Sequence, residues 1–159
     1  MAFLTTIYTA GLMGQSNARE VWQTPAEVFS MLLAAGIGGS AILLILGRTL
    51  LPDEQKLSLA WILGLSASMS LVLFSAELIF APFKSEEAEW VMHYLLHGEL
   101  AAFFLLGLCI AFVVPTIIIA MAIRSKTTAT LTLASLLSLI GLWMVKHAWL
   151  IAPQMIPLS

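Results

Sequence analysis

Four long apolar stretches, separated by short polar breaks, follow one another along the chain from about residue 28 onward. Each is long enough to cross a membrane, because a transmembrane helix needs about 20 mostly apolar residues. Loops this short force neighbouring helices to run in opposite directions. We therefore expect one transmembrane domain over residues 1–159, an all-α up-down four-helix bundle. The predicted spans are residues 28–47, 57–83, 90–123 and 128–152.

The third stretch is too long for one straight span. As a helix it would reach about 50 Å, whereas the hydrocarbon core of a bilayer is about 30 Å thick. We expect residues 90–99 to lie at the interface, above it, or inside a protein-lined cavity, and Pro115 to kink the remainder. Residues 1–27 lack the basic start of a signal peptide. They are predicted to lie along the interface or against a partner.

Basic residues are unevenly distributed between the two sides of the predicted bundle. Because loops rich in Lys and Arg stay in the cytoplasm, the first and third loops are predicted to be cytoplasmic. Both termini are then extracytoplasmic, in a multi-pass protein of the inner (cytoplasmic) membrane. The two loops carry four basic residues and the other non-membrane segments carry two: Arg48, Lys56, Arg124 and Lys126 against Arg19 and Lys84.

The composition agrees with a chain that lies mostly in lipid. Apolar residues make up 60% and charged residues 10% of the 159 residues, whereas a soluble domain carries about 25% charged residues. This excludes a cytosolic enzyme and, with a net charge of −2, a nucleic-acid binder. The single Cys109 excludes an internal disulfide framework and any site with several cysteine ligands. Redox or hydrolytic chemistry would therefore need a partner subunit.

Ionisable residues of the predicted spans gather toward the side that holds the termini. Such residues are costly in a membrane and are functional candidates by default. One polar region at one end of a bundle is typical of a small-molecule or proton-coupled site. Structural alternatives stay open: the histidines could simply be hydrated, and Glu77 or Lys146 could snorkel to the interface or belong to a structural ion pair. The cluster comprises Glu77, His93, His97, Glu99, Lys146 and His147, with Trp22, Gln23 and Glu27 at the entry to the first span.

Four short patterns along the chain, taken together, point to a known family. They are residues 17–22 with the small-residue span at Gly36, Gly38 and Gly39, the pair Ala76-Glu77, the run from Glu99 through Gly107 to Pro115, and the closing Gly141, Lys146 and residues 152–154. These patterns resemble the polysulfide reductase membrane subunit, or NrfD-like, family. Members are usually longer, with further helices, and have Arg where this chain has Lys146 and Gly where it has Pro153.

The resemblance implies a membrane-anchor subunit of a respiratory oxidoreductase complex that binds a quinone or quinol, menaquinone or ubiquinone. It also implies an iron–sulfur subunit on the extracytoplasmic face, serving a molybdenum-containing or similar catalytic subunit. The subunit itself would hold no metal. His93 or His97 would donate to a quinone carbonyl, Lys146 would stabilise the reduced anion, and Glu77 and Glu99 would relay protons. The predicted binding site also includes His147 and Trp22.

Two other classes of function remain open from the residues. In a b-type cytochrome subunit, His97 and His147 would be the axial ligands of one haem b between the third and fourth spans. Three histidines are too few for two such haems. The second class is a non-redox transport or assembly subunit, in which the polar cluster would carry ions or hold a partner.

Overall fold

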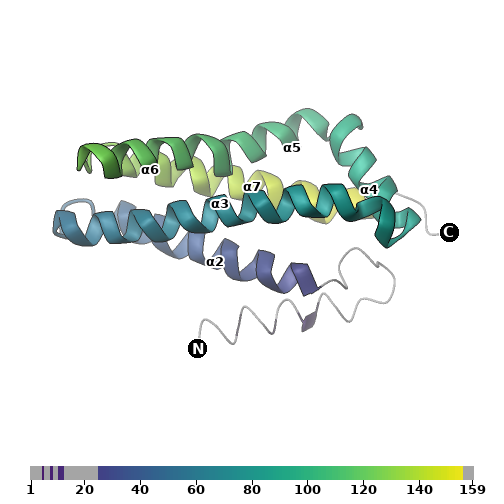
Figure 1. The fold of residues 1–159 in the computed structure, drawn as a ribbon, viewed down its shortest axis with the longest axis horizontal. Helices are drawn as coiled ribbons and strands as arrows, with labels where there is room; N and C mark the ends of the chain where they lie inside the picture. Colours follow the sequence, from purple (N-terminus) through teal and green to yellow (C-terminus); the bar gives the residue numbers. More distant parts are fainter. Residues whose placement is uncertain (1–4, 6–7, 9–10, 13–24, 156–159) are drawn as a thin grey trace.

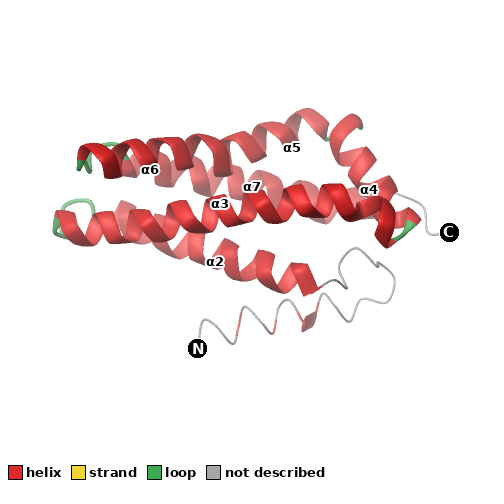
Figure 2. Cartoon of the chain, in the orientation of Figure 1, coloured by secondary structure: helices red, strands yellow, loops and turns green. Residues whose placement is uncertain are grey.

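The computed structural model describes residues 25–155 together with residues 5, 8, 11 and 12. The elements of residues 25–155 are all helices (Figure 2). Four helical stretches are long and apolar enough to cross a membrane: Ala26–Leu46, Asp53–Lys84, Ala101–Ser125 and Leu131–Met155. The described part of the chain is therefore all-helical, with four helices of the length and hydropathy expected of a multi-pass membrane protein. Its elements are α2 (Pro25–Leu46), α3 (Asp53–Lys84), α4 (Glu86–His97), α5 (Ala101–Leu108), η2 (Cys109–Val113), α6 (Val114–Ser125) and α7 (Leu131–Met155).

The long helices alternate in direction, so α2 starts and α7 ends at the same end of the bundle (Figure 1). The α3–α4 turn lies at this end, which we name the acidic end. From their positions in these helices, Glu27, Glu77, Lys84, residues 86–99 and Lys146 belong to the half of the bundle toward this end. The opposite end carries the α2–α3 and α6–α7 loops, residues 47–52 and 126–130, with the adjoining helix turns to residues 56 and 124, and we name it the basic end. The predicted up-down arrangement is confirmed.

The third apolar stretch is not one straight helix. Its first part is the separate helix α4, which crosses the acidic end and packs on α3, α5 and α7 (Figure 1). The Ser85 hydroxyl caps α4 by accepting a hydrogen bond from the Ala88 N–H (3.2 Å). The helix ends at Gly98, where a Cβ atom would lie 2.5 Å from the Tyr94 carbonyl oxygen. The membrane-crossing helix starts only at Ala101, later than the predicted residue 90.

A π-helical turn, η2, precedes Pro115 in the third span. Proline has no N–H to donate and its ring crowds the preceding turn of an α-helix. The wider turn places the Val114 N–H on the Cys109 carbonyl, five residues back. The two helices that flank this turn have different neighbours. Helix α5, before the turn, packs on α4 and α7, whereas α6, after it, packs on α3 and α7. The irregularity predicted at Pro115 is thus a π turn.

Small residues and one aromatic cluster hold the helices together. A Cβ atom on Gly141 of α7 would lie 2.2 Å from the Ala111 backbone nitrogen, so the two backbones are in direct contact there. Phe74 of α3 packs edge-on against Phe104 and Trp149, with ring centroids 5.8 and 5.5 Å away. Close backbone approach through small residues is a common way for membrane helices to associate. These contacts hold the second half of α7, which begins near Gly141, against α3 and the third span.

Candidate functional site

An ion pair between α2 and α7 lies inside the acidic end of the bundle. The Lys146 Nζ is 3.1 Å from Glu27 Oε1 and donates a hydrogen bond to the Ser30 hydroxyl at 2.7 Å. The Glu27 side chain is only 5% exposed and that of Lys146 19%. Lys146 lies about 14 Å along α7 from the end of the helix. The pair therefore joins an interior position of α7 to the first turn of α2, with the Glu27 carboxylate buried.

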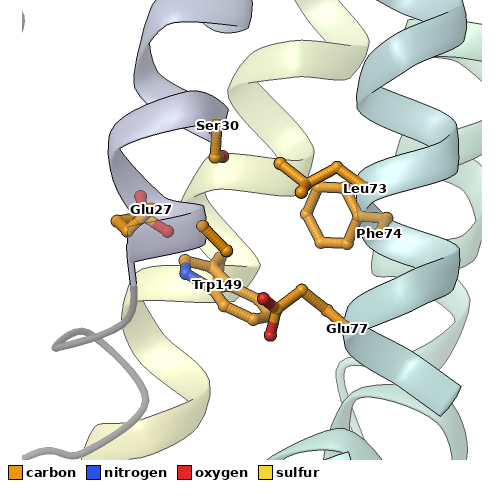
Figure 3. Close-up of a pocket in the computed structure, with 7 residues that line it drawn as sticks. Glu27, Ser30, Leu73, Phe74, Glu77 and Trp149 are labelled. Atoms are coloured by element: carbon orange, nitrogen blue, oxygen red, sulfur yellow. The ribbon is translucent and has the colours of Figure 1, made fainter. Parts of the chain in front are cut away.

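Two small cavities adjoin this ion pair, between α2, α3 and α7. The first lies among Glu27, Ser30, Glu77 and Trp149 (Figure 3), and the second extends past Ser30 to Lys146. Each has a volume of about 10 Å³, which is room for about one water molecule. Both share Ser30, Leu73 and Phe74 as wall residues. Polar groups from three helices thus surround a space of water size.

Trp149 stands between the two carboxylates that line the first cavity. In Figure 3 its ring lies between Glu27 of α2 and Glu77 of α3, with the indole nitrogen turned toward α2. Trp149 is 4% exposed, and its Nε1–H has no hydrogen-bond partner among the described residues. A buried indole normally finds an acceptor. The Trp149 donor is therefore buried and unsatisfied within the described part of the chain.

Glu77 has a second contact outside the cavity. The Lys84 ammonium, two turns further along α3, donates a hydrogen bond to Glu77 Oε2. The Glu77 side chain is 15% exposed and that of Lys84 is 32% exposed. Glu77 therefore lies between the interior cluster and the surface. We name Glu27, Ser30, Glu77, Lys146 and Trp149 the polar cluster.

The structure separates the residues that the sequence grouped together. Glu77 and Lys146 line the cavities, and Lys146 pairs with Glu27 and not with Glu77 or Glu99. Glu99 is exposed in the turn between α4 and α5. His93 and His97 are exposed on α4 and stack on each other, with ring centroids 4.9 Å apart. The predicted Trp22, with most of the predicted interfacial segment, lies outside the described residues.

His147 lies on another face of α7. Its exposed ring stacks on Trp143, with centroids 5.3 Å apart, and meets Phe103 of α5 edge-on at 6.1 Å. Among the ring contacts of residues 25–155, none joins His147 to His97. The two predicted axial ligands are thus in separate aromatic pairs in this structure.

Sequence reasoning named Glu27 at the entry to the first span but gave it no role, and it did not single out Ser30 or Trp149. The predicted first span began at residue 28, so Glu27 was placed in the interfacial segment before it. In the structure α2 begins at Pro25, and Glu27 is buried within its first turn. A signal was present, because a lysine deep in the fourth span needs an anion, and Glu27 is the carboxylate at the matching end of the first span.

Comparisons with family models, with curated proteins and with solved structures found no match to this chain. The resemblance noted in the sequence stays a prediction.

Proposed function

We propose that the chain is the quinone- or quinol-binding membrane subunit of a respiratory oxidoreductase complex. In this proposal the polar cluster moves the protons that accompany quinone chemistry at the acidic end. The observation that carries it is the buried Lys146–Glu27 pair, beside water-sized cavities that reach Glu77. Ionisable groups inside an apolar bundle are costly, and proton relays are among the functions that retain them.

Quinone reduction takes up protons together with electrons, so it needs groups that can hold and release them. Glu77, at the partly exposed side, exchanges protons with water or with the quinone. In this proposal, a water molecule in the first cavity, which Ser30 also lines, links Glu77 to Glu27. Lys146 balances the charge of Glu27 within the bundle. The cluster therefore has an entrance, a water-sized passage and an interior carboxylate.

The quinone ring stays outside the polar cluster in this proposal. Sites that enclose a small organic molecule have volumes of about 300–1,000 Å³, and each cavity here has about 10 Å³. The exposed imidazoles of His93, His97 and His147 are the candidate donors to a quinone carbonyl at this end. Glu99, exposed nearby in sequence, is a candidate for the outermost proton exchange.

The resemblance to the polysulfide reductase membrane subunits supports the proposal at particular positions. Glu77 and Lys146, two residues of the similar patterns, belong to the polar cluster. Gly141, a third, makes the backbone contact that positions this half of α7. An iron–sulfur subunit, docked on the extracytoplasmic face at the acidic end, would pass electrons between the quinone and a catalytic subunit. The membrane would be the inner membrane of the cell.

The first experiment is to purify the tagged chain with its partners from its native membranes in mild detergent. Quinone in the extract, with no b-type signal in a reduced-minus-oxidised visible spectrum, is the expected result. A b-type haem signal from the chain alone would replace the proposal with the cytochrome alternative and direct attention to His97 and His147. A preparation with neither quinone nor haem would favour the transport or assembly alternative.

The second experiment measures quinone-linked turnover of the purified complex in variants. Glu27→Gln and Glu77→Gln should each lower turnover about a hundredfold, because a lost acid–base group costs at least that much. Glu54→Gln is the matched control, since Glu54 is an exposed carboxylate at the basic end. His97→Ala should impair turnover without loss of assembly. Unchanged turnover in both the Glu27 and Glu77 variants would overturn the proton role of the cluster.

A further inference from the structure

A long apolar groove lies on the outside of the bundle toward the basic end. It runs between α3 and α6 and has a volume of about 510 Å³, which is within the range of sites that hold small organic ligands. Its walls include Trp61, Gly64 and Leu65 of α3, and Ile119, Ala120 and Ile123 of α6. This groove is separate from the cavities of the polar cluster, which lie between α2, α3 and α7.

The contact between Gly64 and Ile119 sets the register of the groove. A Cβ atom on Gly64 would lie 3.1 Å from Ile119 Cγ2, so the two residues face each other across antiparallel helices. Because the helices are antiparallel, the position three residues before Gly64 on α3 lies at the same level as the position three residues after Ile119 on α6. Trp61 thus lies about one turn or less from the level of Arg124. The groove has a tryptophan and an arginine at its basic end, and continues inward for about 12 Å to Thr116.

The charge at this mouth is unsatisfied within the described part of the chain. Arg124 is exposed, and its guanidinium has no ion-pair or hydrogen-bond partner among the described residues. The nearby acidic side chain of Asp53 already accepts hydrogen bonds from Lys56 and Thr128, each at 3.1 Å. Trp61 is 62% exposed, as expected for a ring at the level of lipid headgroups.

We propose that this groove binds one acyl chain of an anionic phospholipid, with the phosphate on Arg124. Basic pockets between membrane helices are characteristic sites for anionic headgroups. The apolar walls receive the acyl chain, the guanidinium binds the phosphate, and the Trp61 indole lies at the depth of the glycerol esters. This lipid site does not depend on the proposed quinone function, because it shares no residue with the polar cluster.

The test measures lipid retention on the delipidated full chain by native mass spectrometry. Dioleoyl phosphatidylglycerol is the anionic probe, and dioleoyl phosphatidylcholine has the same acyl chains without net charge. The wild-type chain should retain more phosphatidylglycerol than phosphatidylcholine. Arg124→Gln should lower this preference about fivefold. Arg48→Gln is the matched control, because Arg48 is also exposed and unpaired among the described residues at the basic end.

A second variant pair tests the groove rather than the charge. Ala120→Leu places a larger side chain in the groove and should reduce retention of both lipids, whereas Ala102→Leu, at an exposed position on α5, should not. Equal retention of the two lipids by the wild-type chain would overturn the proposal. An equal loss in the Arg48 and Arg124 variants would do the same, because it would mean general surface charge. Quinone-linked turnover, measured separately, tests the proposed function and leaves this result unaffected.

Discussion

The two ends of the bundle differ in the sign of their charge and in where that charge lies. At the basic end, four basic and two acidic side chains lie in loops and first or last turns, and the Lys56–Asp53 pair has a 71% exposed carboxylate. At the acidic end, the described residues include six carboxylates and two lysines, and the Lys146–Glu27 pair lies between helices in the interior of the bundle. Surface charge costs little because water solvates it, whereas interior charge must be compensated by partners. The interior charge at the acidic end therefore depends on the pairing of Lys146 with Glu27, whereas the surface charge at the basic end does not depend on such a partner.

The largest expected effect comes from breaking the interior pair. Lys146→Met should lower the free energy of unfolding by about 3–5 kcal/mol, because it leaves the Glu27 carboxylate buried without a cation. Lys56→Met, at the basic end, should have no measurable effect, since Asp53 stays in water. Denaturation of the detergent-solubilised chain by heat or SDS measures both.

The double variant Glu27→Gln/Lys146→Met sharpens this result. It removes both charges, so it should recover much of the stability lost in the single variant. Equal stability of the Lys146 and Lys56 single variants would contradict the distinction between the two ends.

The next largest effect is expected at the backbone contact between Gly141 of α7 and Ala111, which positions the second half of α7. Gly141→Ala should destabilise the chain by about 1–3 kcal/mol, because the new methyl group meets the backbone of Ala111. Gly39→Ala is the control, since a Cβ there meets no atom within 4 Å, and alanine favours the helix over glycine. The same denaturation measurements compare them. A destabilisation of Gly39→Ala as large as that of Gly141→Ala would rule out this packing.

Substitutions in the Glu77–Lys84 pair should change the free energy of unfolding only slightly, while loss of the Glu77 carboxylate should strongly change turnover. Lys84→Met should cost at most about 1 kcal/mol, because both side chains are partly exposed and water compensates the loss. Glu77→Gln should be similarly mild in denaturation, yet should strongly reduce quinone-linked turnover. A large loss of stability with unchanged turnover would instead make Glu77 a structural residue.

The smallest effect belongs to the loop contact at the basic end. Thr128→Val removes the hydrogen bond from the Thr128 hydroxyl to Asp53, which joins the α6–α7 loop to the start of α3. Because both groups are near water, which can replace the lost bond, the melting temperature should shift less than in Lys84→Met. Thr127→Val, whose hydroxyl contacts only its own loop, is the control. A shift as large as that of Lys146→Met would contradict the distinction between the ends, because it would mean that a contact at the basic end is as shielded from water as the interior ion pair.

The fold followed from the sequence to a large extent, because apolar length and loop length are local properties. The sequence also predicted that residues 90–99 would not continue the third span, since the stretch exceeds the membrane thickness. It did not locate the end of α4 at His97, directly before Gly98. Nor did it predict the π turn before Pro115, because a kink, a break and a wider turn are all ways to accommodate a proline.

The candidate site was predicted only in part. Glu77 and Lys146 were selected by their depth in the spans, and both line the cavities. His93 and His97 share a helix face, as their spacing requires, but that face is exposed. The direction of a face depends on how its helix is rotated against its neighbours, and the sequence of α4 alone does not contain that rotation.

By itself, the sequence indicated four helices apolar and long enough for a multi-pass membrane protein, with the ionisable residues of the predicted spans toward one end, because hydropathy and charge are sums over nearby residues. Only the tertiary structure decided that Lys146 binds Glu27, that Trp149 is left with a free donor, and that the groove ends at Arg124. These features depend on contacts between residues far apart in the chain. Lys146 and Glu27, for example, are 119 positions apart. Rotation and register of whole helices determine them, and both are set by backbone contacts such as the one between Gly141 and Ala111.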